Sequence, residues 1–230
     1  MPRIVGATLI YLLASGSLGW WETHVQPAGP RGALVQTVTL QILLTVAFLL
    51  VVRHFVLRHV VHPLLHRAQY DELTGALRAG PFWDHAEERI RRALGAQQPV
   101  AFVFLDVDDF KHINDQYGHA TGDLVLQSLG VLLRHAVRQG DLLGRLGGEE
   151  FGWLMLGITP DEAYAATNRV LESCALQTTR GRPVVGLSGG LATADGKRGQ
   201  HPTAWDLARR ADRALYEAKS SGKGHVQRAD

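Results

Sequence analysis

The chain has 230 residues, which is enough for one domain of ordinary size and an appendage. Its formal net charge is only +2, and this lack of a strong basic field argues against nucleic acid as a partner. A single cysteine, Cys174, excludes an internal disulfide, and we expect it to be a small core residue on a helix. The 11 histidines are scattered and predict no zinc site.

Two uncharged apolar runs open the chain, at about residues 4–21 and 33–52. Each has roughly the length of a helix that crosses a bilayer, and a short polar turn rich in proline and glycine separates them. Arg3 before the first run and Arg53 after the second favour a cytoplasmic location for both ends. We therefore expect residues 1–53 to anchor the chain as a multi-pass protein in the inner (cytoplasmic) membrane of the cell, with the remainder in the cytoplasm.

Two other interpretations of these runs stay open. The first run also fits a cleaved signal peptide, because Ala14-Ser15-Gly16 offers small residues near a cut site. The second also fits a buried core helix, because it contains polar residues such as Gln36 and Gln41. Apolar residues then continue among basic ones, so residues 54–70 are predicted to form a signalling helix or linker, which is either a helix that leaves the membrane or a short helix that pairs two subunits.

Beyond the linker, the apolar pattern predicts a mixed α/β domain. The elements expected in chain order are a helix from Pro81 to Leu94, a strand at 99–105, a helix at 124–137, strands at 142–146 and 151–156 around a glycine turn at 147–150, a helix from the capping box at 159–162 to Leu176, a strand at 184–192, and a helix from Thr203 to Gly222. This order is the split βαβ arrangement, an α+β fold in which helices cover an antiparallel sheet.

This topology gathers acidic side chains that are distant in the sequence. The first strand lies beside the third, so Asp106 at the end of the first strand approaches Glu149 and Glu150 in the turn. Carboxylates in such a place suit a hard cation such as Mg²⁺. The glycines at 147 and 148 leave room for a triphosphate, and Lys111 can offset charge on the phosphates.

Four ordered segments carry a more specific pattern. They are Asp71-Glu72-Leu73-Thr74-Gly75, Phe104 to His119, Arg145 to Phe151 and Ala211 to Lys219. Together, over about residues 71–226, they resemble the GGDEF domains of diguanylate cyclases, in the Glu-Glu variant of the motif. The resemblance implies a palm-like nucleotidyl cyclase fold for residues 71–230. It also implies that two GTP molecules condense into cyclic di-GMP and two pyrophosphates across a homodimer.

The resemblance also implies roles for individual residues. Mg²⁺ or Mn²⁺ would be held by Asp106, the carbonyl of Val107, and Glu149. Glu149 would also act as the base for the 3′-hydroxyl, Glu150 would assist at the metals, and Lys111 completes the predicted catalytic residues. The substrate contacts would be Asn114, His119, Asp123, Lys219, Lys223, Gly147 and Gly148, of which Asn114 and Asp123 read guanine. An inhibitory site for the product would be formed by Arg138, Asp141 and Arg169.

Some positions differ from the family pattern, and other functions need comparison. Lys223 stands where an arginine is usual, so an ammonium replaces a guanidinium near the phosphates. The main alternative is a catalytically inactive GGDEF-type receptor for GTP or cyclic di-GMP at the membrane. It predicts the loss of Asp106 or Glu149, and both are present. A cyclase for a mixed dinucleotide is a third interpretation, which the presence of Asp123 disfavours.

Overall fold

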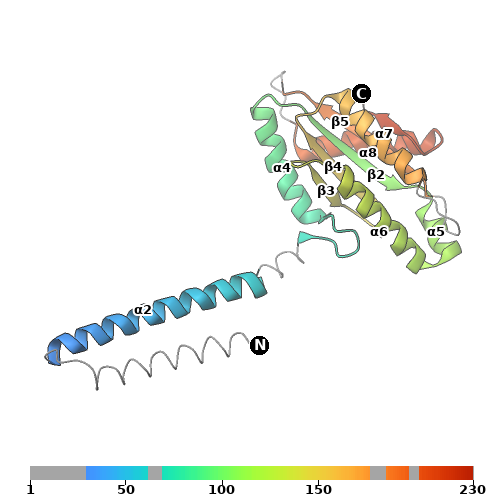
Figure 1. Ribbon diagram of the computed structural model, residues 1–230. Helices are drawn as coiled ribbons and strands as arrows, with labels where there is room; N and C mark the ends of the chain where they lie inside the picture. Colours follow the sequence, from blue (N-terminus) through green and yellow to red (C-terminus); the bar gives the residue numbers. More distant parts are fainter. Residues whose placement is uncertain (1–29, 62–68, 177–184, 197–201, 230) are drawn as a thin grey trace. The chain divides into compact units, whose positions relative to one another are not determined.

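The computed structural model describes residues 30–61, 69–176, 185–196 and 202–229 (Figure 1). The chain divides into two compact units, residues 1–66 and 67–230, and each is described by itself. In the first unit, helix α2 spans Pro30–Val56 and a π-helical segment, η1, follows at Leu57–Val61. The first of the two predicted membrane spans, residues 4–21, lies outside the described residues.

Helix α2 carries the second predicted span. The helical stretch from Leu34 to Val60 is long and apolar enough to cross a bilayer, and none of it is buried. Its large apolar side chains, Ile42 and Leu49 among them, are exposed. A core helix of a soluble protein and a signal sequence also meet the criteria of length and composition, but a core helix is mostly buried. The lack of burial thus favours a span or a signal over a core helix.

The second unit is built on a six-stranded sheet in the order β1-β3-β4-β2-β5-β6. The strands are β1 (Leu77–Arg78), β2 (Val100–Val107), β3 (Leu142–Arg145), β4 (Glu150–Leu156), β5 (Leu187–Ala194) and β6 (Val226–Arg228). The four central strands pair antiparallel, which confirms the predicted arrangement. The short strands β1 and β6 were not predicted, and they add a parallel pair at each edge, so the sheet is mixed.

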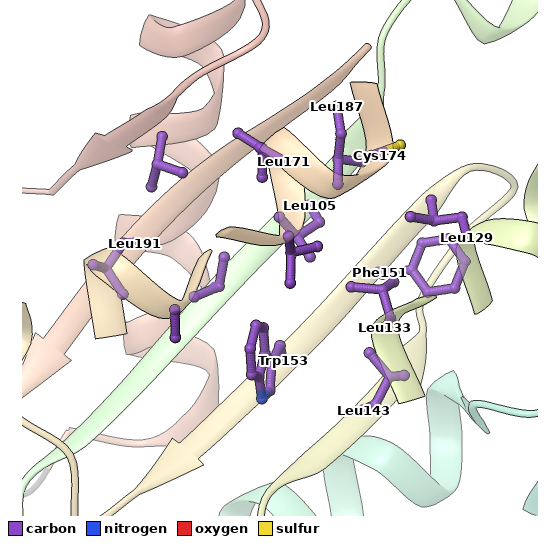
Figure 2. Close-up of a cluster of buried hydrophobic side chains, with 14 of the residues drawn as sticks. Leu105, Leu129, Leu133, Leu143, Phe151, Trp153, Leu171, Cys174, Leu187 and Leu191 are labelled. Carbon is purple, nitrogen blue, oxygen red and sulfur yellow. The ribbon is translucent and has the colours of Figure 1, made fainter. Parts of the chain in front are cut away.

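Five helices cover the two faces of this sheet. They are α4 (Ala79–Gly95), α5 (Phe110–Tyr117), α6 (His119–Ala136), α7 (Pro160–Leu176) and α8 (Ala204–Ser220). Side chains alternate between the faces of a strand, so Val103 and Leu105 of β2 pack under α5, α6 and α7. Figure 2 shows Leu105 among the side chains of this cluster. Phe102 of the same strand packs instead under α4 and α8.

The predicted boundaries were wrong where tertiary pairing extends or splits an element. Strand β2 runs two residues beyond its predicted end because Asp106 and Val107 pair with Ser188 and Leu187 of β5. Glu150 is the first residue of β4, so it leaves the predicted turn. The predicted helix at 124–137 is α6, which begins earlier, and α5 before it was not predicted.

Several local predictions are confirmed. The capping box between Thr159 and Glu162 opens α7, and a second one between Thr203 and Asp206 opens α8. Cys174 is buried on α7, as expected of a core residue. Burial, together with the nearby charge of Asp108, raises the pKa of its thiol to about 11.

Candidate functional site

Acidic side chains meet where β2 and β4 lie side by side. Asp106 of β2 and Glu150 of β4 are directly opposite each other across this pair of strands. Burial is the main reason that the pKa of Asp106 lies above its ordinary value; Lys219 opposes this, while the charges of Glu149 and Asp108 add to it. The pKa of Glu150 is also raised, by burial first and then by the charges of Asp106 and Glu149. The structure thus brings together the three acids that the sequence pointed to.

One cation faces this acidic cluster. The ammonium nitrogen Nζ of Lys219 lies 2.6 Å from Oδ1 of Asp106, and the Asp106 side chain is only 8% exposed. The distance alone would allow a hydrogen bond, but the contact is better described as an ion pair, because the buried Oδ1 has no hydrogen-bond partner of adequate geometry in the described part of the chain. Oδ1 therefore has the ammonium of Lys219 as its charged neighbour and no hydrogen bond from any other group in the described part of the chain.

Helix α8 places Lys219 at the site, together with an acid that was not predicted. Asp212 lies seven residues before Lys219, close to two helical turns, so both side chains leave the same face of α8. The charge of Asp212 contributes to the raised pKa of Glu150. Helix and sheet approach closely because Gly190 of β5 has no side chain; a Cβ there would collide with the backbone of Ala211 and Leu215. The spacing of seven residues was the available signal for Asp212.

The donor set at this site fits a hard cation. In the described ranges no three Asp, Glu, His or Cys side chains form a metal-binding group. The predicted set, however, needs only two carboxylates and a main-chain carbonyl, because Mg²⁺ commonly takes its remaining ligands from water and substrate phosphates. Within the part of the chain that the structure describes, the buried Oδ1 of Asp106 has no hydrogen-bond partner of adequate geometry, and every predicted ligand atom is an oxygen. Val107 stands next to Asp106 at the end of β2, and its role as a ligand stays a prediction.

The diglycine turn leaves space for the neighbouring acid. A side chain on Gly147 would collide with the carboxylate of Glu150, which folds back over the turn. A side chain on Gly148 would meet no atom within 4 Å, so this glycine faces open space. The two glycines therefore serve different purposes: one accommodates Glu150 and the other leaves the turn accessible to a large ligand.

The residues predicted to read guanine come from α5 and α6. A side chain on Gly122 would collide with the amide of Asn114, so Asn114 lies against the residue that precedes Asp123. Asp123 is exposed in the first turns of α6, and His119 is exposed at the start of the same helix. Lys111 is exposed on α5. The two helices thus place Asn114 against Gly122, the neighbour of Asp123 in the chain, and the reading of guanine by Asn114 and Asp123 stays a prediction.

Lys223 pairs with a different acid from Lys219, and it lines a groove of about 480 Å³. The groove is lined by Asp108, Asp109, His112, Ile113, Gln116, Tyr117, Gly186, Gly222, Lys223 and Gly224. Nζ of Lys223 is 2.7 Å from Oδ1 of Asp109, and both residues have left-handed backbone, with φ of 63° and 53°. This hydrogen bond raises the pKa of Lys223 and lowers that of Asp109. The contact between Lys223 and Asp109 was not predicted, because the two residues are far apart in the sequence.

The three residues of the predicted product site line a second pocket, of about 250 Å³. Arg138, Asp141 and Arg169 come from the α6–β3 connection and α7, and Trp153 of β4 lies among them. The indole Nε1 of Trp153 donates to Oδ2 of Asp141 at 3.3 Å, and the amide of Leu156 donates to Oδ1 at 3.3 Å. The contact of Trp153 was missed, because an apolar strand residue indicates only the core.

Comparisons with known proteins show which family the sequence of this chain matches. A family model described as "Diguanylate cyclase, GGDEF domain" matches residues 68–225. The chain is 36% identical over 163 residues to diguanylate cyclase DgcM of Escherichia coli, in an alignment that covers 71% of this chain and 39% of DgcM. It thus spans about two fifths of that relative.

Two solved structures of such domains are also similar to this chain in sequence and in fold. The active GGEEF domain of a diguanylate cyclase from Vibrio cholerae is 28% identical with a TM-score of 0.62, over 66% of this chain and 97% of that one. A microbial GGDEF domain studied for its interaction with cyclic di-GMP is 32% identical with a TM-score of 0.63, over 72% of this chain and 99% of that one.

Proposed function

The chain belongs to the GGDEF diguanylate cyclase family, and from this membership we propose that it condenses two GTP molecules into cyclic di-GMP and two pyrophosphates. One observation carries the proposal: Asp106 and Glu150 face each other across two strands, the charge of Glu149 acts on both, and Lys219 pairs with Asp106. The pKa values of Asp106 and Glu150 are both raised, and such shifts gather at catalytic sites, so the cluster favours an enzyme.

The substrate would be held at both of its ends. The carboxylate of Asp123 can accept from N1–H and the 2-amino group of guanine together, which adenine cannot offer, and Asn114 lies beside it. Lys219 and Lys223 would exchange their present carboxylate partners for phosphate oxygens. Lys111 is exposed and free to approach the same phosphates.

The reaction joins each 3′-oxygen to the α-phosphorus of the other GTP. Glu149 would accept the proton of the attacking hydroxyl as the new P–O bond forms. The bond from the α-phosphorus to the bridging oxygen breaks, and pyrophosphate leaves. Mg²⁺ or Mn²⁺ held by Asp106, the Val107 carbonyl and Glu149 would offset charge on the phosphates. Glu150 would support this site as a neighbouring carboxylate.

One domain holds one GTP, so two copies of the chain must face each other for turnover. A homodimer is therefore part of the proposal. The segments α2 and η1, which precede the domain, would hold the two copies together at the inner membrane, with the domain in the cytoplasm. Basic residues at the end of α2 and in η1, Arg53 and Arg58, agree with this orientation.

We also place product inhibition in the pocket of Arg138, Asp141 and Arg169. Two exposed guanidinium groups around one concave site suit the phosphates and guanine edges of cyclic di-GMP. In the related microbial domain, the interaction with cyclic di-GMP has been described. The pocket lies in the layer of α6 and α7, whereas Lys219 reaches the acidic cluster from α8.

The test is an assay of the full chain, purified in detergent, with GTP and Mg²⁺. We expect chromatography to detect cyclic di-GMP and pyrophosphate, and Glu149→Gln to abolish both. Arg91→Gln changes an exposed residue of α4 and serves as the control. Binding of GTP or cyclic di-GMP without any product would overturn the proposal in favour of a receptor. A mixed dinucleotide from GTP and ATP would point to the third interpretation.

A further inference from the structure

We propose that the ammonium of Lys219 occupies the cation position at Asp106 and keeps divalent metal ions out of the site until a nucleotide arrives. The inference rests on the proposed function, because it concerns the metal of that same site. Its basis is one contact: Nζ of Lys219 lies 2.6 Å from a buried carboxylate oxygen that accepts no hydrogen bond from any other group among the described residues.

The surroundings of Asp106 make a counter-ion necessary. Its side chain is 8% exposed, and the charges of Glu149 and Asp108 act on it. An isolated charge is expensive to bury, so the ionised form of Asp106 needs a cation beside it. Lys219 has the only ammonium or guanidinium that forms an ion pair with Asp106 in the described part of the chain. A divalent ion that approached Oδ1 would have to displace this ammonium.

The second lysine–aspartate pair shows what an ordinary surface contact looks like in the same domain. Lys223 and Asp109 approach equally closely, at 2.7 Å, but their side chains are 41% and 62% exposed. Water solvates both partners there, so this ion pair does not keep other ions away and contributes little to stability. The two pairs thus share their chemistry and differ in burial, which makes Lys223 a matched control for Lys219.

A triphosphate would change this balance. Lys219 is 35% exposed, so its ammonium can move toward an incoming phosphate without crossing the core. Once the lysine pairs with the nucleotide, Oδ1 of Asp106 becomes available to the metal that the nucleotide brings with it. Metal and nucleotide would then bind with positive coupling, and the apo domain would have little affinity for free divalent ions.

The test measures Mn²⁺ binding to the full chain by electron paramagnetic resonance, with no nucleotide present. Relative to wild type, Lys219→Met should bind Mn²⁺ on the order of tenfold more tightly, within the usual range of coupling between sites. Lys219→Arg and Lys223→Met should resemble wild type. Adding Asp106→Asn to Lys219→Met should remove the gain. Lys219→Gln, checked by thermal unfolding, replaces Lys219→Met if that variant does not fold.

Equal Mn²⁺ affinity in wild type and Lys219→Met would overturn the inference. So would an equal gain in Lys223→Met, because the effect would then follow from net charge alone. The titration contains no GTP and measures no turnover. Failure to make cyclic di-GMP would therefore refute the proposed function and leave this result standing on its own.

Discussion

Asp71 and Arg145 form an ion pair that joins the start of the domain to the diglycine turn. Oδ1 of Asp71 lies 3.0 Å from Nη1 of Arg145, and the two side chains are only 19% and 18% exposed. The same guanidinium donates from Nε and Nη2 to the carbonyl oxygen of Gly148, at 3.0 and 2.7 Å. One side chain thus ties the turn that carries Glu149 to the residue that the chain reaches directly after the linker.

This arrangement predicts that Arg145→Lys lowers turnover by about 10- to 100-fold, the usual effect of losing a positioning contact. Lysine keeps the charge but cannot hold Asp71 and the Gly148 carbonyl at the same time. The measurement is kcat for cyclic di-GMP together with the midpoint of thermal unfolding. Arg91→Lys, at an exposed pair of α4, is the control. Unchanged turnover in Arg145→Lys would show that the turn is held by other contacts.

The same pair predicts a dependence of stability on pH. Burial by itself raises the pKa of Asp71, but hydrogen bonds from Thr74 and Arg145 outweigh it and leave the pKa below the ordinary 3.8. Because the folded pKa is lower than the unfolded one, this stabilisation is complete above pH 3.8 and disappears as the pH falls through the folded pKa. Urea unfolding should therefore show Asp71→Asn less stable than wild type at pH 7, with the difference shrinking toward pH 3.

The acidic cluster predicts a variant that is more stable and less active. Burial and the charges of Asp106 and Glu149 raise the pKa of Glu150, so its ionised form disfavours the folded state. Glu150→Gln should raise the free energy of unfolding at pH 7 by a few tenths to about 1 kcal/mol, and Tm by up to about 3 °C. Glu88→Gln should bring no such gain, because hydrogen bonds from Arg91 lower the pKa of Glu88. A less stable Glu150→Gln would contradict this account.

The pocket on the opposite layer predicts a variant released from inhibition. Arg138→Ala removes an exposed guanidinium from the pocket, so the concentration of cyclic di-GMP that gives half-inhibition should rise at least about tenfold. Trp153→Phe, which removes the N–H donor to Asp141 together with part of a buried ring but no guanidinium, should have a smaller effect. Inhibition curves at fixed GTP test both variants. Inhibition of Arg138→Ala at the wild-type concentration would mean that the product acts elsewhere.

The predicted parts of the fold depend on neighbours in the sequence. The apolar runs gave β2 and β4, and the two capping boxes on α7 and α8 are visible as Thr–x–x–acid patterns. Strand β1 has two residues and β6 has three, too few to show a period, and they exist because β3 and β5 offer them partners. Gly118, with φ of 81°, separates α5 from α6, and the short, mostly polar α5 was not predicted because it has too few apolar residues to show a helical period.

The candidate site likewise has one part that the sequence predicted and another that depends on tertiary packing. The approach of Asp106 to the diglycine turn followed from topology alone, because the split βαβ order places those strands side by side. The ion-pair partners of Lys219 and Lys223 could not be predicted from this topology. Lys219 and Asp106 lie on α8 and β2, more than a hundred residues apart, and the packing of that helix on β5 and β2 brings them together.

The close packing of α8 on β5 predicts the consequence of adding a single methyl group. Gly190 of β5 faces the backbone of Ala211 and Leu215, and a Cβ there would collide with main-chain atoms that cannot rotate away. Gly190→Ala should therefore lower the free energy of unfolding by about 1–3 kcal/mol, and it should lower turnover because α8 carries Lys219. Gly80 of α4 has open space around it, so Gly80→Ala should instead stabilise by up to about 1 kcal/mol. Urea unfolding of both variants decides the matter: if Gly190→Ala is as stable as wild type, the helix is free to shift on the sheet, and the position of Lys219 is not fixed by this contact.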